Sequence, residues 1–322
     1  MLNRKIVWMF SGQGSQYFNM GRDLYESDPA FREWLGWCDG HYRARAKTSL
    51  LDVIYPLREA GAGAEFDDLR QTHPALFCIQ YSLAQTLLQR GLKPDCLLGY
   101  SLGEIVAAAV AGVMPFERLL AVVLEQAERL PALVGPGAML AVLAPADVVS
   151  ADAPMFAGTW IAARNFSNHF VLAGSPAAIE RAQRHFQSRE ISSQRLPVPV
   201  AFHSPCMDPA ERALREYVRG FELRVPSLPL VSASRVETLA RVTPDFFWDV
   251  VRRPVRFDET VALLEARGPC VYVDLGPSGT LATFLKYALP PGTRSSFFPI
   301  LSPYRRAREN LERFTRALAE TY

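Results

Sequence analysis

Short apolar runs alternate with amphipathic helical patterns along most of the chain. Residues 6–10 and 95–99 have the length and composition of buried strands, and residues 74–90 have the repeat of a helix. Thr72 lies near the cap of that helix, Gly91 ends it, and one face carries Leu76, Ile79, Leu83 and Leu87. Strands separated by helices form a parallel sheet with helical crossover connections. We therefore predict an α/β fold.

A different order occupies the middle of the chain. The pattern there predicts strand, helix, strand, strand, helix and strand, at residues 139–143, 146–150, 160–164, 170–173, 177–187 and 191–196. That is the order of a ferredoxin-like unit. The αβ alternation then resumes, with elements at residues 209–218, 228–232 and 270–274 and a last helix from Pro303. We predict a small domain over residues 134–198, inserted into a larger domain formed by residues 1–133 and 199–322.

Composition and charge exclude several classes of function. The 322 residues are 49% hydrophobic and 21% charged, the usual mixture of a globular protein with a buried core. The net charge of +2, without a dense Lys/Arg block, argues against nucleic acid as a partner. The five cysteines are scattered without a C-x-x-C pair, so we expect reduced thiols and no metal. Because no segment has the pattern of a signal peptide or a membrane span, we expect a cytoplasmic protein without a membrane partner.

Residues 99–103, Gly-Tyr-Ser-Leu-Gly, match the pattern G-x-S-x-G between a predicted strand and a predicted helix at residues 102–111. In that context the glycines permit a sharp turn that exposes the Ser101 hydroxyl. Backbone N–H groups at the start of the helix lie close enough to stabilise an oxyanion. We therefore interpret Ser101 as a nucleophile, against the ordinary alternative of a Gly-Ser turn that caps a helix.

A serine hydroxyl needs a general base, because it is a weak nucleophile at neutral pH. The chain has five histidines: His41, His73, His169, His185 and His203. His73 stands beside Pro74 at a predicted helix start, and two others fall in the inserted domain, where surface or core roles are more common. His203 ends the apolar approach of residues 199–202, where the chain returns to the large domain. The residues alone leave the choice of His203 open.

Several segments together match the motifs of one enzyme family. Residues 10–16 are similar to F-P-G-Q-G-S-Q, with serine in place of proline, and residues 99–104 are similar to G-H-S-x-G-E, with Tyr100 in place of histidine. Residues 200–203 are similar to the segment H-A-F-H, which ends in the catalytic histidine. Residues 253–257 resemble N-P-V-x-W, and residues 274–277 resemble E-x-G-P. With these motifs in order, the chain resembles the malonyl-CoA:acyl carrier protein transacylase family, including the acyltransferase components of polyketide synthases.

The resemblance covers nearly the whole chain and implies both a fold and a catalytic site. The fold would be an α/β-hydrolase-like large domain with a parallel sheet, plus an inserted ferredoxin-like small domain. Ser101 and His203 would form a dyad in the cleft between them. The backbone N–H groups of Gln13 and Leu102 would form the oxyanion hole, which requires no particular side chain.

The resemblance also implies how the histidine is oriented and what the site binds. A backbone carbonyl near Val250 would orient His203, and Asp208 is the alternative orienting acid. No cofactor would be bound, because the substrates are carried as phosphopantetheine or coenzyme A thioesters. The partners would be acyl carrier protein and small acyl thioesters. Phe202, Tyr100 and Asn165 would contribute to substrate binding.

One position departs from the family pattern. Members that take malonyl groups usually hold the free carboxylate with an arginine 25 positions after the serine. That position is Gln126 in this chain, and a neutral amide cannot neutralise a carboxylate. Because an unpaired buried charge costs on the order of several kcal/mol, malonyl is disfavoured. Two alternatives are that Arg129, one helical turn further on, binds the carboxylate, or that Arg164 in the inserted domain does so.

A pocket without the arginine that binds the malonyl carboxylate fits an uncharged acyl group. That acyl group then passes to water or to a thiol. The family includes free-standing members that hydrolyse acyl groups from carrier proteins, and the chain resembles that subgroup. We expect a trans-acting acyl hydrolase of polyketide biosynthesis and a monomer. The alternatives are a transferase loading acetyl or another uncharged acyl group, a malonyl transferase using Arg129, and a docking module without chemistry. Candidates for contacts to an acidic carrier protein are Arg252, Arg253, Arg256, Arg305, Arg306 and Arg308.

Overall fold

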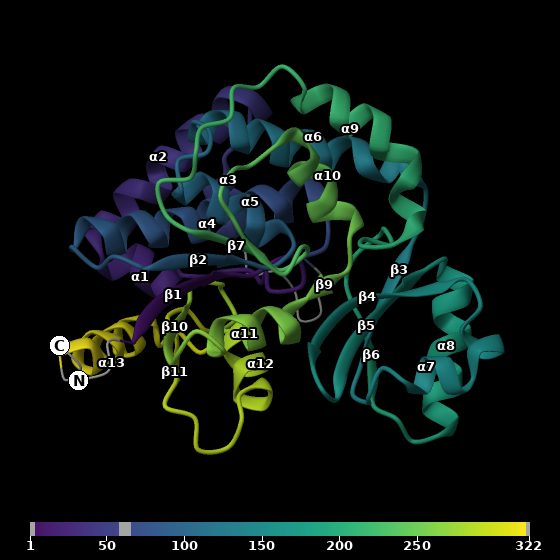
Figure 1. The fold of residues 1–322 in the computed structure, drawn as a ribbon. Coiled ribbons are helices and arrows are strands. Elements are labelled where there is room, and N and C mark those ends of the chain that lie inside the picture. The colour runs from purple at the N-terminus through teal and green to yellow at the C-terminus, as the bar shows by residue number, and fades with distance from the viewer. Residues whose placement is uncertain (1–3, 58–65, 320–322) are drawn as a thin grey trace.

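The computed structural model describes residues 4–57 and 66–319 and contains two β-sheets surrounded by helices (Figure 1). The larger sheet has the strand order β11-β10-β1-β2-β7-β8. Its first five strands are parallel, and β8 pairs antiparallel with β7 at one edge. The strands are β1 (Lys5–Phe10), β2 (Cys96–Gly99), β7 (Leu230–Ser232), β8 (Glu237–Leu239), β10 (Cys270–Asp274) and β11 (Ser296–Pro299).

Helices cover both faces of this sheet, as the apolar runs predict. In β1, Trp8 and Phe10 point into one core cluster, and Val7 and Met9 point into the other. The sequence of a strand that is buried on both faces is apolar throughout, rather than alternating between apolar and polar residues. This confirms the predicted parallel α/β architecture.

Most helices pack on the first of these faces, on the upper side of Figure 1. They are α1 (Arg22–Ser27), α2 (Pro29–Ala46), α3 (Leu50–Ile54), α4 (Leu69–Gln89), α5 (Leu102–Val110), α6 (Phe116–Val134), α9 (Glu211–Val218) and α10 (Pro244–Arg252). Those that pack on the opposite face are α11 (Phe257–Glu265) and α12 (Thr280–Ala288). The last helix, α13 (Ala307–Ala319), lies beside β11.

The smaller sheet has the strand order β6-β3-β5-β4-β9. Its strands are β3 (Ala138–Val142), β4 (Thr159–Phe166), β5 (His169–Gly174), β6 (Ser193–Arg195) and β9 (Val255–Arg256). One face packs against α8 (Pro176–Ser188) through Leu140, Phe170 and Phe186, and the other face joins the core of the larger sheet. The sequence did not predict that β9, from the large domain, pairs parallel with β4. The boundaries at residues 134 and 198 stay a prediction.

The first helix of the smaller unit differs from the prediction. Instead of one helix over residues 146–150, the chain forms the short helix α7 (Val148–Ala151) and the 3-10 turn η1 (Ala153–Phe156). No residue of α7 is buried, whereas Phe156 in η1 packs against Phe186 of α8. The apolar residues 148 and 149 predicted a helix, but a single turn without a buried face cannot extend. The remaining order is that of a ferredoxin-like unit.

Two helix starts were wrong in the prediction. Helix α4 begins at Leu69 rather than Pro74, because the side chain of Asp68 caps it by accepting from the backbone N–H of Arg70. Helix α13 begins at Ala307 rather than Pro303, because its first N–H donates to a carboxylate oxygen of Asp23 at 2.7 Å. That acceptor lies in α1, so a local pattern does not reveal it. No helix in the described ranges has both the length and the apolar character to span a bilayer.

Candidate active site

Ser101 occupies a sharp bend between β2 and α5. Its backbone has φ 55° and ψ −126°, a strained conformation for a residue other than glycine. The two glycines of the motif make the bend possible by close packing. A Cβ atom at Gly103 would stand 1.9 Å from the carbonyl oxygen of Phe10, and one at Gly99 would stand 2.2 Å from Cα of Glu104. The bend therefore holds the Ser101 hydroxyl at the carboxyl end of the parallel strands, as the motif predicts.

His203 lies beside this serine. Its Nε2 is 2.8 Å from Oγ of Ser101, and its backbone φ of 60° is also positive. The backbone N–H of His203 donates to the carbonyl of Val251 at 2.9 Å, which fixes the segment to the end of α10. The structure thus brings together the two residues that were predicted as nucleophile and base, although their roles stay predictions.

The orienting carbonyl belongs to Arg253, not to Val250. Nδ1 of His203 donates to Arg253 O at 2.8 Å. Arg253 follows the last residue of α10 and is extended, so its carbonyl can accept a hydrogen bond from outside the helix. The carbonyl predicted to orient the histidine was therefore three residues too early in the chain. The predicted alternative, Asp208, is also wrong: its half-exposed carboxylate pairs with Arg252.

This arrangement sets the proton positions on the imidazole. A carbonyl oxygen only accepts, so Nδ1 carries the proton and Nε2 is left to accept from the Ser101 hydroxyl. Burial lowers the pKa of His203 to about 4, and the bond to the Arg253 carbonyl opposes that effect. The imidazole is therefore neutral near pH 7, the state in which it acts as a base.

A small cavity of about 20 Å³ opens beside Ser101. Its volume is that of about one water molecule or one methyl group. The lining residues are Gln13, His73, Ser101, Leu102, Gln126, Phe202, Val250 and Val251. Phe202 and Gln126, both predicted to bind substrate, line the cavity, and Gln126 is only 2% exposed. None of the lining residues is a lysine or an arginine.

Gln13 and Leu102, predicted for the oxyanion hole, flank the cavity from two elements. Leu102 is the first residue of α5, so its backbone N–H has no acceptor within the helix. Gln13 follows β1, and its side chain is held because Nε2 donates to Oγ1 of Thr72 at 3.0 Å. Oxyanion stabilisation would use the backbone N–H groups of these two residues. Their role stays a prediction.

Arg129 and Arg164 lie outside the cavity, and their role as substrate ligands stays a prediction. Arg129 is exposed and pairs with Glu125 at 2.8 Å, and it does not line the cavity. It stands three residues after Gln126, a rotation of about 60° around the helix axis, which moves it off the buried face of α6. Arg164 is an exposed residue of β4 and does not line the cavity.

Tyr100 and Asn165 do not line the cavity either, and their role in substrate binding stays a prediction. The Tyr100 hydroxyl donates to Oδ1 of Asn165 at 2.9 Å, and Nδ2 of Asn165 contacts Nδ1 of His169 at 2.8 Å. Burial raises the pKa of Tyr100, so the hydroxyl keeps its proton. Tyr100, next to Ser101, therefore joins the larger sheet to β4 of the smaller one.

The sequence missed His73 as a residue of the site. It lies in α4, is 3% exposed and lines the cavity, and burial lowers its pKa to about 4. The available signal was its spacing, because His73 stands three residues before Leu76 on the predicted apolar face. Val251 was missed for a different reason: nothing in a short apolar run distinguishes a residue that faces a cavity.

Four of the arginines that were predicted to contact a carrier protein pair with carboxylates of this chain. Arg252 pairs with Asp208, Arg253 with Asp249, Arg256 with Glu259 and Arg308 with Glu312. These contacts offset part of their positive charge, and their role in docking stays a prediction. The described residues include no group of three or more His, Cys, Asp or Glu side chains that is placed to hold a metal ion.

Comparison with known proteins gives consistent similarities. The family model described as "Acyl transferase domain" matches residues 7–322. The chain is 37% identical to "Polyketide biosynthesis acyltransferase homolog PksD" of Bacillus subtilis (strain 168), over 96% of this chain and 95% of that protein. It is also 37% identical to "Polyketide biosynthesis acyltransferase homolog BaeD" of Bacillus velezensis, over 97% and 96% of the two chains.

Solved structures agree with this similarity. A loading acyltransferase from the avermectin modular polyketide synthase superposes with a TM-score of 0.87 at 26% identity, over 98% of this chain and 99% of that one. The acyltransferase domain from the second module of the salinomycin polyketide synthase has a TM-score of 0.84 at 32% identity, over 96% and 72%. The predicted α/β fold with a smaller ferredoxin-like unit is thereby confirmed.

Proposed function

The chain belongs to the acyl transferase domain family, and from that premise we propose that it is a trans-acting acyl hydrolase of polyketide biosynthesis. Its substrates are uncharged acyl groups held as thioesters on acyl carrier protein. One observation carries the proposal: Oγ of Ser101 lies 2.8 Å from Nε2 of His203, beside a cavity lined by no cationic side chain.

The first half of the reaction forms an ester on Ser101. The hydroxyl oxygen attacks the thioester carbonyl carbon while its proton passes to Nε2 of His203. The backbone N–H groups of Gln13 and Leu102 stabilise the resulting oxyanion. The carbon–sulfur bond then breaks, and His203 returns the proton to the departing thiolate of the phosphopantetheine arm. The products of this half are the acyl ester and a free carrier-protein thiol.

The second half releases the acyl group. A water molecule attacks the ester carbonyl and gives one proton to His203, and the oxyanion again forms against the same two N–H groups. The bond between the carbonyl carbon and Oγ of Ser101 breaks, and His203 returns the proton to that oxygen. The products are the free carboxylic acid and regenerated enzyme, so no other co-reactant is needed.

The cavity supports an uncharged acyl group. Gln126 stands where the family's malonyl-binding members usually have an arginine, and it is buried. Burying a carboxylate beside a neutral amide costs on the order of several kcal/mol, which disfavours a malonyl group. The relatives named as polyketide biosynthesis acyltransferase homologs support a place in polyketide assembly.

The test offers acyl carrier protein loaded with acetyl or malonyl groups and follows each by mass spectrometry. We expect the acetyl group to be lost to water and malonyl to be retained. Ser101→Ala should abolish turnover and the labelling of the enzyme by a fluorophosphonate. Arg129→Ala is the matched control, because its side chain is exposed outside the cavity, and it should behave as wild type.

The same experiment separates the alternatives. A stable acyl-enzyme that empties only when free carrier protein is added would identify a transferase that loads acetyl or another acyl group. Efficient use of malonyl that Arg129→Ala abolishes would instead identify a malonyl transferase. Unchanged turnover of every thioester by Ser101→Ala would overturn the proposal.

A further inference from the structure

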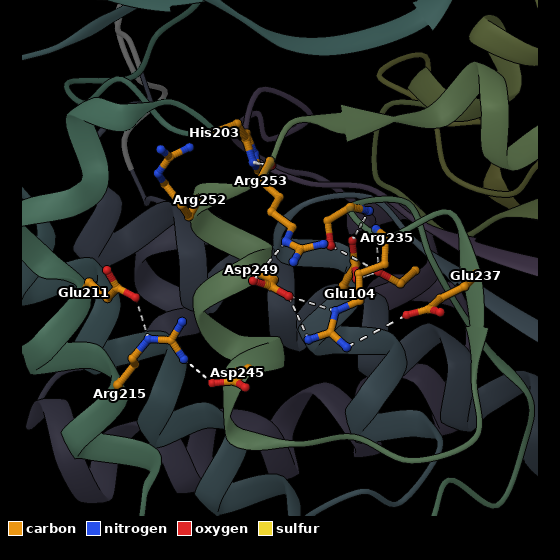
Figure 2. Close-up of polar contacts among 12 residues, drawn as sticks. Glu104, His203, Glu211, Arg215, Arg235, Glu237, Asp245, Asp249, Arg252 and Arg253 are labelled. Atoms are coloured by element: carbon orange, nitrogen blue, oxygen red, sulfur yellow. Dashed lines mark hydrogen bonds and ion pairs between the residues drawn. The ribbon is translucent and has the colours of Figure 1, made fainter.

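His203 is attached at two points to the chain around the end of α10. Its backbone N–H donates to Val251 O at 2.9 Å. Its Nδ1–H donates to Arg253 O at 2.8 Å (Figure 2). The position of the imidazole therefore depends on where the carbonyl of Arg253 lies. Since Arg253 stands beyond the helix, with φ −76° and ψ 144°, the helical ladder alone does not fix that carbonyl.

Asp249, one turn earlier in α10, holds Arg253 through both its backbone and its side chain. The backbone N–H of Arg253 donates to the Asp249 carbonyl at 2.9 Å, and Nε of Arg253 lies 3.1 Å from Oδ1 of Asp249. These two contacts hold the backbone N–H and the side chain of Arg253, and so restrain the position of the residue whose carbonyl His203 uses. The side chain of Asp249 thus adds a contact that the hydrogen bonds of the helix alone do not provide.

Asp249 is held in turn by Arg235. Nε and one terminal nitrogen of Arg235 lie 2.8 and 2.7 Å from Oδ2 of Asp249. The side chains of Asp249 and Arg235 are only 9% and 19% exposed. A carboxylate at this depth needs its cationic partners, because removing one leaves a poorly solvated charge. The paired geometry is therefore the stable arrangement of the carboxylate.

The same network reaches the helix that carries the nucleophile. Ser232 accepts from the backbone N–H of Arg235 at 3.2 Å and donates to Oε2 of Glu104 at 2.6 Å. The backbone N–H of Ser234 donates to Oε1 of Glu104 at 2.8 Å. Glu104 lies in the first turn of α5, three residues after Ser101. A continuous set of polar contacts thus connects the start of α5 with the carbonyl that His203 uses (Figure 2).

We propose that Asp249, held by Arg235, is a positioning residue for the reaction. It keeps the Arg253 carbonyl where Nδ1–H of His203 donates, so that Nε2 stays directed at the Ser101 hydroxyl. The inference rests on the proposed function, because it takes His203 as the general base. Asp249, Arg235 and Arg253 do not line the cavity, so their loss should affect the reaction step rather than substrate binding.

The central test is Asp249→Asn, which keeps the shape of the side chain and removes its charge. Because small misplacements of a reacting group lower rates steeply, we expect kcat with acetyl-loaded carrier protein to fall roughly tenfold while KM stays unchanged. The rate constant for fluorophosphonate labelling of Ser101 should fall by the same factor, since it too depends on the base. A purely structural role would lower the thermal midpoint and leave both rates of the folded protein unchanged.

Asp245→Asn is the matched control. Asp245 lies in the same helix, one turn before Asp249, and pairs with Arg215 of α9, away from His203 (Figure 2). This variant also removes one carboxylate from an arginine pair. We expect wild-type kcat and labelling rates.

Arg253→Ala provides a second and independent variant. It removes the contact to Asp249 but keeps the carbonyl, and its half-exposed side chain makes loss of the fold unexpected. We expect a similar fall in kcat, and the double variant Asp249→Asn/Arg253→Ala should lose no more than either single one. If Asp249→Asn does not fold, the positioning role is tested with Arg253→Ala, by kcat and by the rate constant for fluorophosphonate labelling.

Two results would count against the inference in different ways. Wild-type rates in a folded Asp249→Asn or Arg253→Ala variant, alongside an active wild-type enzyme, overturn the positioning role and leave the proposed function intact. A wild-type enzyme that neither turns over any thioester nor becomes labelled at Ser101 overturns the proposed function, and the inference falls with it.

Discussion

At the scale of single residues, the site is held in backbone conformations that most side chains avoid. Ser101 and His203 both have a positive φ, which costs of the order of 1–3 kcal/mol at each position. Neighbouring contacts over-determine these conformations: close packing at the glycines holds the first residue, and two hydrogen bonds to the end of α10 hold the second. These contacts therefore keep the side chains of Ser101 and His203 at a fixed distance from each other.

Gln126 gives a prediction about substrate choice. Replacing it with arginine places a cation against the cavity, so malonyl-loaded carrier protein should become a substrate or form a stable acyl-enzyme. We expect the ratio of malonyl to acetyl turnover to rise at least about tenfold, which corresponds to about 1.4 kcal/mol. The measurement is competition between the two loaded carrier proteins, followed by mass spectrometry.

Gln126→Met is the control for size without charge, and the ratio should not rise in that variant. A folded Gln126→Arg variant that still refuses malonyl would show that this position does not choose the substrate.

The side chains that meet at the site could be predicted from the sequence, whereas the backbone atoms that support them could not. Ser101 was found because a short motif demands glycines on both sides of the nucleophile. His203 was found by resemblance, since the residues alone did not single it out from the other histidines. The carbonyl of Arg253 escaped prediction because every residue has a backbone carbonyl, and only the geometry of the helix end shows which one is free.

At the scale of elements, the bend between β2 and α5 depends on a glycine at position 103. A methyl group there would stand 1.9 Å from the carbonyl oxygen of Phe10, so Gly103→Ala must push α5 away from β1. We expect a loss of about 3 kcal/mol in the free energy of unfolding, together with loss of fluorophosphonate labelling. Urea titration measures the first quantity.

Gly36→Ala in α2 is the matched control, because no atom lies within 4 Å of the added methyl group. At an exposed helical position it should stabilise the protein by roughly 0.5–1 kcal/mol. A Gly103→Ala variant as stable as wild type would refute the close-packing argument.

The predicted elements were right where a segment carries its own signal. Strands β1, β2 and β10 are continuous apolar runs, and the sequence placed them within one residue. The predicted start of α13 was wrong because the side chain that caps the helix belongs to Asp23, 284 residues earlier in the chain. Strand β9 was missed because two residues have no periodicity of their own, and only the presence of β4 makes them a strand.

At the scale of the whole molecule, stability should depend on pH through Glu104. Burial raises the pKa of this carboxyl group from 4.5 to about 7, against hydrogen bonds from Ser232 and Ser234 that lower it. The folded state therefore holds the proton more tightly than the unfolded chain does. The contribution of Glu104 is complete below pH 4.5 and is lost as the pH rises through 7.

We expect the contribution of Glu104 to the free energy of unfolding to fall by on the order of 3 kcal/mol between pH 5 and pH 8. Glu104→Gln should remove that contribution, so the difference between the urea titrations of wild type and variant at each pH measures it. Burial also raises the pKa of Asp274, to about 6, which adds a slope of the same sign, whereas the lowered pKa values of His73 and His203 add a slope of the opposite sign below pH 6.5, and both effects remain in the variant. An equal slope in Glu104→Gln and wild type would show that Glu104 does not titrate in this range.

The pairing of β4 with β9 ties the two sheets to His203. The segment from Arg253 to Arg256 gives its first carbonyl to the imidazole and its last two residues to the smaller sheet. A tilt of the smaller sheet would therefore move the carbonyl of Arg253, three residues away, which accepts the hydrogen bond from His203. A substrate or partner that shifts the smaller sheet would therefore also shift the short backbone segment that orients His203 toward Ser101.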